Sequence, residues 1–171
     1  SRVLQHLKGF SPSRVLINDL KPNYDMDKDS SIEWCNKEEV LSQADIISLH
    51  LPLTGQTKNF ITKSEMAIMK SDAIIINTSR GGIINENDLY DVMKSGHLSA
   101  AAIDVFEQEP YDGKLREIDH CLLTAHMGSM SVDCRTLMEV EATNEAIRFF
   151  KGESLEGEVP EEEYEVQYIK V

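Results

Sequence analysis

Five short apolar runs recur along this chain, and each one ends in polar residues. A sixth, briefer extended piece is expected at 31–35. The five runs span residues 14–18, 45–50, 73–77, 99–105 and 121–124. Segments with helical spacing or helix-capping patterns separate them, so predicted strands alternate with predicted helices. This alternation predicts an α/β fold, with a parallel sheet, helices on both faces and right-handed crossovers.

Helix starts are marked by side chains that can accept hydrogen bonds from a first helical turn. Asn36 with Glu39, and Thr62 with Glu65, form capping-box patterns. The polar stretch 20–31 is predicted to be a loop. The predicted helices are 1–8, 37–43 after Asn36, 63–70 after Thr62, 86–95 after Asn85 and a long helix from Ser131 to about Phe150.

The stretch Ala73–Gly82 is the centre of the pattern. Its first residues are apolar at every position, which indicates a strand buried on both faces. Arg80 falls just past the carboxyl end of that strand, the edge where open α/β sheets bind ligands. Gly81 and Gly82 then allow a sharp turn and a close approach of the backbone to a ligand.

Polar features follow four further strand ends as well. Because the carboxyl ends of parallel strands share one edge, these residues are predicted to line one crevice. The five features are Asp19, the corner His50-Leu51-Pro52, Thr78-Ser79-Arg80, Asp104 and His126.

The residue types in this crevice suggest acid/base chemistry beside an anchored anion. Arg80 offers a planar fork of donors for a carboxylate or carbonyl oxygen. His126 can exchange a proton near neutral pH, and a nearby carboxylate, Glu109 or Glu107, could stabilise its imidazolium form. Asp19, after the second strand of a dinucleotide fold, is placed to accept hydrogen bonds from ribose hydroxyls.

Composition narrows the class of protein. The 171 residues carry a net charge of −13, which argues against nucleic acid or an anionic membrane as a partner. Cys35, Cys121 and Cys134 are widely spaced and form no CxxC pattern, so free thiols in a reducing, cytoplasmic compartment are expected. The five histidines show no metal-binding spacing, so no metal site is predicted.

Four motifs together resemble the NAD-binding domain of the D-isomer-specific 2-hydroxyacid dehydrogenases, a Rossmann-like domain. The resemblance covers about residues 1–150, and 151–171 is interpreted as an acidic tail or a remnant of the substrate domain. The motifs are Ala44–Thr54 (ADIISLHLPLT), Asn77–Gly82 (NTSRGG), Ala102–Pro110 (AIDVFEQEP) and Thr124–Ser129 (TAHMGS).

This resemblance implies individual roles. Arg80 would bind the carboxylate and carbonyl of a small 2-hydroxy or 2-oxo acid, of the phosphoglycerate, glyoxylate/hydroxypyruvate or lactate type. His126 would be the general acid/base and Glu109 its partner. Asp104 would contact the nicotinamide end, and Asp19 would favour NAD over NADP. The residues implied to line the NAD site are Asp19, Leu51, Pro52, Thr78, Ser79, Arg80, Asp104, His126, Gly128 and Ser129.

The chain also departs from the family pattern. The family's first strand and its G-x-G-x-x-G loop would precede Ser1. That strand would be the central one, between the strands that end at Asp19 and at His50-Leu51-Pro52, or between their neighbours. The chain is therefore interpreted as a fragment that binds NAD weakly and is inactive alone. Smaller departures are Ala125, where proline is usual, and Ser131, where threonine is usual.

Two other functions fit the same motifs. One is a non-catalytic NAD-sensing module like the co-repressors that share this fold. The other is a dehydrogenase for phosphite or formate. A homodimer is expected for the full-length parent, since family members usually pair through this domain.

Overall fold

The strands form where the apolar runs fall, and every strand pairing is parallel. The computed structural model describes residues 2–20 and 32–158. The extended piece expected at 31–35 is a strand, and all five longer runs are confirmed. The strands are β1 (Val15–Ile17), β2 (Ile32–Trp34), β3 (Ile46–Leu49), β4 (Ile74–Asn77), β5 (Ala100–Ile103) and β6 (Cys121–Leu123).

The predicted caps define the helix starts. The side chains of Asn36, Thr62, Asn85 and Ser131 each accept a hydrogen bond from a backbone N–H of the first turn. The helices are α1 (Arg2–Leu7), α2 (Lys37–Gln43), α3 (Lys63–Ile68), α4 (Glu86–Lys94) and α5 (Val132–Lys151), with 3₁₀ turns η1 (Lys8–Phe10), η3 (Lys114–Glu117) and η4 (Met127–Ser129). The predicted loop 20–31 lies almost wholly outside the described residues, as does most of the predicted acidic tail.

The described strands form two sheets. β3, β4, β5 and β6 are neighbours in that order, while β1 and β2 form a separate two-stranded sheet. No strand pairing joins β1 to β3 within residues 2–20 and 32–158. The break falls where the resemblance places a further, central strand.

One face of the four-stranded sheet is packed far more tightly than the other. Ile47, Ile75 and Ile103 share one face and lie in one core with residues of α2, α3 and α4. On the opposite face Ile46 is 60% exposed and Leu122 is 65% exposed. The prediction that β4 is buried on both faces therefore holds for one face only, because its other side chains are half-buried.

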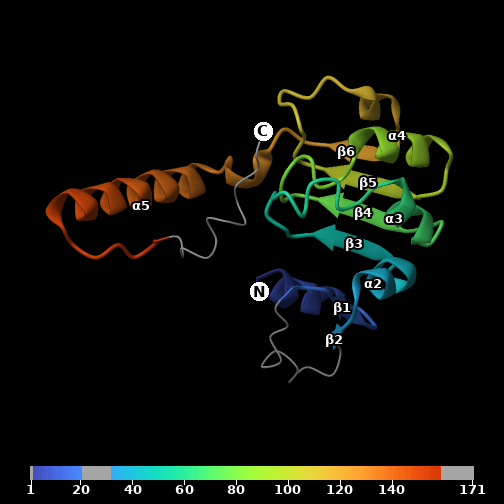
Figure 1. Cartoon of the computed structure of the whole chain (residues 1–171), viewed down its shortest axis with the longest axis horizontal. Helices are drawn as coiled ribbons and strands as arrows, with labels where there is room; N and C mark the ends of the chain where they lie inside the picture. Colours follow the sequence, from blue (N-terminus) through green and yellow to red (C-terminus); the bar gives the residue numbers. More distant parts are fainter. Residues whose placement is uncertain (1, 21–31, 159–171) are drawn as a thin grey trace.

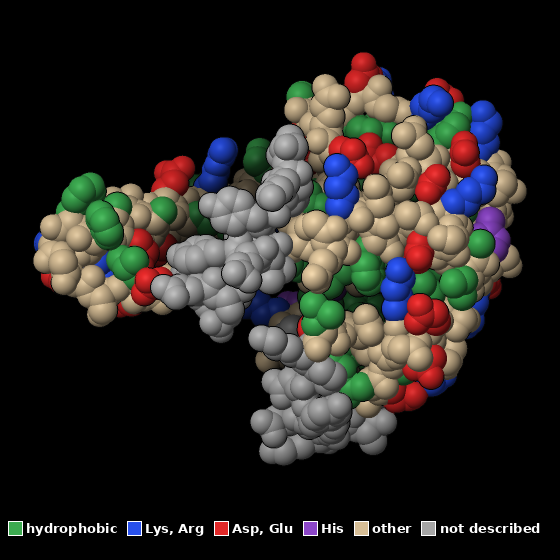
Figure 2. All heavy atoms as spheres, in the orientation of Figure 1, with side chains coloured by type: hydrophobic (Ala, Val, Ile, Leu, Met, Phe, Trp, Pro, Cys, Tyr) green, Lys and Arg blue, Asp and Glu red, His purple; other side chains and the backbone are tan. Residues whose placement is uncertain are grey.

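The long helix α5 extends away from both sheets (Figure 1). It buries no residue in the described part of the chain, although the other long helix, α4, buries four. Figure 2 shows apolar side chains gathered at its outer end, where Phe149 is 68% exposed and Phe150 is 86% exposed. None of the described helices is long and apolar enough to cross a membrane.

Two isoleucines on neighbouring strands test which face of the sheet is packed. Ile75 is 0% exposed and Ile46 is 60% exposed. Ile75→Ala is expected to lower the free energy of unfolding by about 2–5 kcal/mol, because it opens a cavity in the core. Ile46→Ala should change it by no more than about 0.5 kcal/mol. Urea unfolding followed by circular dichroism checks both, and equal losses would contradict this packing.

Candidate active site

The turn after β4 is shaped by a buried asparagine. Asn77 is 2% exposed, and its side-chain amide donates to the backbone oxygen of Arg80 at 2.9 Å. Its side-chain oxygen accepts from the backbone N–H of Ser79 at 3.1 Å and from the Ser79 hydroxyl at 2.8 Å. This Asx-type turn brings Arg80 to the carboxyl edge of the sheet. One guanidinium nitrogen of Arg80 donates to the Ser79 carbonyl at 2.7 Å, and its other donors are not used in the described structure.

The loops after β4 and β5 touch at a glycine. A Cβ atom on Gly81 would lie 2.0 Å from the backbone carbonyl of Phe106, closer than real side chains approach. Gly81 thus allows a close approach between two segments of the protein's own backbone, while the approach to a ligand stays a prediction. Gly82 has φ of 78°, the left-handed region that favours glycine. The two glycines thus bring the Arg80 turn directly against the segment that follows β5.

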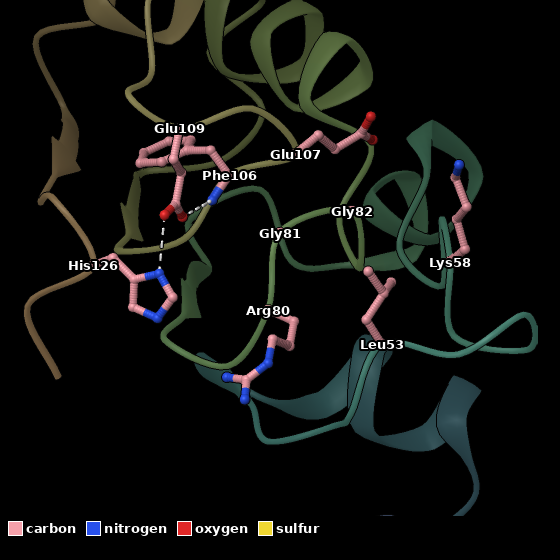
Figure 3. Close-up of a pocket in the computed structure, with 9 residues that line it drawn as sticks. All are labelled: Leu53, Lys58, Arg80, Gly81, Gly82, Phe106, Glu107, Glu109 and His126. Carbon is pink, nitrogen blue, oxygen red and sulfur yellow. Dashed lines mark hydrogen bonds and ion pairs between the residues drawn. The ribbon is translucent and has the colours of Figure 1, made fainter. Parts of the chain in front are cut away.

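Glu109 and His126 form a hydrogen-bonded pair in the same region (Figure 3). The imidazole Nδ1 lies 3.0 Å from Glu109 Oε2, and the second carboxylate oxygen of Glu109 accepts from the Phe106 N–H at 3.0 Å. The hydrogen bond from His126 and then that from Phe106 hold the pKa of the Glu109 carboxyl below its usual value. Glu109 is therefore ionised near neutral pH and can only accept hydrogen bonds.

His126 has an unusual backbone conformation. Its φ of 52° and ψ of 55° lie in the left-handed region. For a residue with a Cβ this conformation costs about 1–2 kcal/mol, so surrounding contacts must hold it. Its side chain is 48% exposed, which leaves the imidazole accessible to a ligand.

Asp104, the first residue after β5, contacts the turn that carries His126 and is 7% exposed. Its carboxylate accepts from the Thr124 hydroxyl at 2.6 Å and from the Met127 N–H at 2.8 and 3.1 Å. Burial alone would raise the pKa of Asp104, but these hydrogen bonds and the nearby His126 outweigh it and lower the pKa. Its charge is therefore stabilised by groups of the protein itself.

A cavity of about 420 Å³ brings the three predicted catalytic residues together. Figure 3 shows the second ring nitrogen of His126 turned away from Glu109, on the side of the cavity where Arg80 lies. A guanidinium donor thus lies beside a group that can give or take a proton. The cavity is lined by Leu53, Lys58, Arg80, Gly81, Gly82, Phe106, Glu107, Glu109 and His126.

The other predicted site residues do not line this cavity. Asp19 is exposed after β1, in the separate two-stranded sheet. The remaining residues lie in the turns after β3, β4 and β6, except Asp104, which directly follows β5. They are Leu51, Pro52, Thr78, Ser79, Asp104, Gly128 and Ser129.

Of the two carboxylates predicted as possible partners of His126, Glu107 and Glu109, the structure places Glu109 against the imidazole. Glu109 meets His126, whereas Glu107 lines the cavity and its N–H donates to Glu86 Oε1 at 2.7 Å. Leu53 and Lys58 also line the cavity and were not among the predicted site residues; they continue the loop that begins at the His50-Leu51-Pro52 corner. Their place after a strand end is the signal that could have found them. Within 2–20 and 32–158, no cluster of His, Cys, Asp and Glu could hold a metal ion.

Fold and site together define an α/β domain of the doubly wound class, with a hydrogen-bonded Glu–His pair and an arginine beyond its strand ends. The family model described as "D-isomer specific 2-hydroxyacid dehydrogenase, NAD binding domain" matches residues 1–128. The chain belongs to this family, as its motifs predict. The family description also agrees with the prediction of NAD as cofactor.

Individual relatives agree with this assignment. Glyoxylate reductase of Korarchaeum cryptofilum is 35% identical over 153 residues, which cover 88% of this chain and 46% of that protein. D-3-phosphoglycerate dehydrogenase of Bacillus subtilis is 42% identical over 118 residues, or 67% of this chain and 22% of that protein. The chain thus spans less than half the length of these two relatives.

Solved structures show the same likeness. A glyoxylate reductase from Paecilomyes thermophila superposes with a TM-score of 0.84 at 29% identity, over 94% of this chain and 48% of that one. A D-lactate dehydrogenase with NAD+ from Lactobacillus jensenii gives a TM-score of 0.81 at 25% identity, over 93% of this chain and 52% of that one.

Gly81→Ala tests the contact between the two loops. Its added methyl would collide with the Phe106 backbone, so the free energy of unfolding is expected to fall by about 1–3 kcal/mol. Gly55→Ala is the matched control, because no atom lies within 4 Å of the place its methyl would take and its φ is not positive. The control should stay within about 0.5 kcal/mol. Urea unfolding of both variants measures this, and a Gly81→Ala chain as stable as the wild type would show that the loops do not touch.

Proposed function

We propose that this chain is the cofactor-binding part of an NAD-dependent D-2-hydroxyacid dehydrogenase. The observation that carries the proposal is the Glu109–His126 pair in one cavity with Arg80. A proton-transfer group beside an anion-binding fork is what oxidation of a hydroxyl next to a carboxylate requires. The family assignment supports it, since the relatives above are named as reductases and dehydrogenases of such acids.

Arg80 and His126 have different roles toward the substrate: Arg80 binds it and His126 transfers the proton. The Arg80 guanidinium binds the carboxylate through two parallel hydrogen bonds and orients the reacting carbon. His126 Nε2 accepts the hydroxyl proton as the carbon–hydrogen bond breaks with its electron pair, and it returns a proton to the ketone oxygen in the reverse direction. NAD, when bound, supplies the acceptor or donor of that hydride.

Glu109 serves the proton-transfer step through His126. Because its carboxylate is ionised, it stabilises the imidazolium that forms when His126 takes the proton. The Phe106 N–H helps to keep Glu109 in place, and Glu109 occupies the Nδ1 side of the ring. The Nε2 side is therefore the one that faces substrate.

The NAD site is proposed to follow the strand ends. Asp19 is exposed after β1, where its carboxylate can accept hydrogen bonds from ribose hydroxyls and would repel a 2′-phosphate. The turns after β3, β4 and β6 supply the other cofactor contacts, from Leu51 and Pro52, Thr78 and Ser79, and Gly128 and Ser129. Asp104 remains a proposed contact for the nicotinamide end.

The finer features of the whole protein belong to the same proposal. Its substrate is a small 2-hydroxy or 2-oxo acid, and it acts as a homodimer in the cytoplasm. The three cysteines, Cys35, Cys121 and Cys134, are all free thiols, in keeping with a reducing compartment. No observation favours the co-repressor-like alternative.

Substitution of His126 tests the proposed chemistry in the full-length protein that carries this chain. His126→Asn is expected to lower kcat for oxidation of the hydroxyacid by about 10²–10⁴-fold, because the proton acceptor is lost. Arg80→Lys should act mainly on KM, since the planar fork is lost while the charge remains. His120→Asn is the matched control: His120 is exposed and does not line the cavity. An unchanged kcat in His126→Asn would refute the role of this residue.

A further inference from the structure

The turn that presents His126 is held on both sides by hydrogen bonds to one buried residue, Asp104. His126 itself donates its backbone N–H to the backbone carbonyl of Asp104 at 2.8 Å. Met127, the next residue, donates its N–H to both Asp104 carboxylate oxygens at 2.8 and 3.1 Å. Thr124, two residues before His126, donates its hydroxyl to Asp104 Oδ1 at 2.6 Å. The left-handed residue is therefore bracketed by hydrogen bonds to Asp104.

The Thr124 hydroxyl helps to orient the Asp104 carboxylate. Asp104 is 7% exposed, so its carboxylate depends on protein donors to keep its orientation. The Met127 N–H and the Thr124 hydroxyl both reach the same oxygen, Oδ1. Residue 125 is alanine, which has no ring to fix φ, so these hydrogen bonds help to determine the shape of the turn.

We propose that Thr124 is a positioning residue. Its hydroxyl holds the Asp104 carboxylate in the orientation that accepts the Met127 N–H, and this keeps the His126 imidazole within hydrogen-bond reach of Glu109. The geometry of the proposal is independent of turnover, and only its consequence for catalysis rests on the proposed function.

Glu109 provides an internal reporter for the position of His126. Its Oε1 is held separately by the Phe106 N–H at 3.0 Å, so Glu109 stays in place when the imidazole moves. The charged groups near the imidazole are Glu109, Asp104 and the cavity residue Arg80. Because the hydrogen bond from His126 is the largest cause that lowers the pKa of Glu109, loss of that bond raises this pKa.

The test removes the hydroxyl and keeps the shape of the side chain. In Thr124→Val, the pKa of Glu109, followed by ¹³C NMR of its carboxyl in the whole chain, is expected to rise toward the ordinary glutamate value. The Met127 amide should exchange with solvent at least about tenfold faster, as expected for loss of a supported hydrogen bond. Thr124→Ser keeps the hydroxyl and should restore both measurements.

Thr143→Val is the matched control, because among the described residues the Thr143 hydroxyl bonds only within α5, to the Glu139 carbonyl at 2.7 Å. It should change neither measurement. The proposal is overturned if Thr124→Val leaves both the Glu109 pKa and Met127 exchange unchanged, or if Thr124→Ser behaves like valine. Should Thr124→Val not fold, Thr124→Ala is judged by the same criteria. None of these measurements uses NAD or turnover, so a failed dehydrogenase assay and a failed positioning role remain distinguishable.

Discussion

The hydrogen bonds made by the segment after β5 are the support on which the candidate site depends. The Asp104 carboxylate accepts a hydrogen bond from the turn that carries His126, and the Phe106 N–H donates one to Glu109. The Phe106 carbonyl also lies against Gly81, next to Arg80. One short segment, residues 104–106, therefore supports Arg80, Glu109 and His126 together, through the side chain of Asp104 and the backbone of Phe106.

This support explains why the site can hold groups that are costly elsewhere. A left-handed histidine and a buried carboxylate are each unfavourable alone. Here the Met127 N–H of the strained turn donates to the carboxylate, and the carboxylate in return holds the turn in place. The arrangement leaves the imidazole exposed on one side and paired with Glu109 on the other, as proton exchange with a ligand requires.

Local signals in the sequence predicted most of the fold. The apolar runs and the cap at Asn36 depend on neighbours a few residues away, so their structures follow from sequence spacing. The three residues proposed as catalytic were predicted from motif resemblance together with the shared edge of parallel strands. The hydrogen bond of Met127 to Asp104 joins residues 23 positions apart, and the contact of Gly81 with Phe106 joins residues 25 positions apart. The spacing of residues along the sequence does not predict such contacts. The uneven burial of β4 likewise depends on which helices cover each face.

The protonation pattern of the His126 ring tests the central claim most directly. An ionised Glu109 can only accept, so the proton of neutral His126 must lie on Nδ1 and leave Nε2 free to act on substrate. ¹⁵N NMR of the imidazole near neutral pH distinguishes the two tautomers. The Glu109–His126 contact predicts a protonated Nδ1 and an unprotonated Nε2. A ring protonated on Nε2 alone would contradict it.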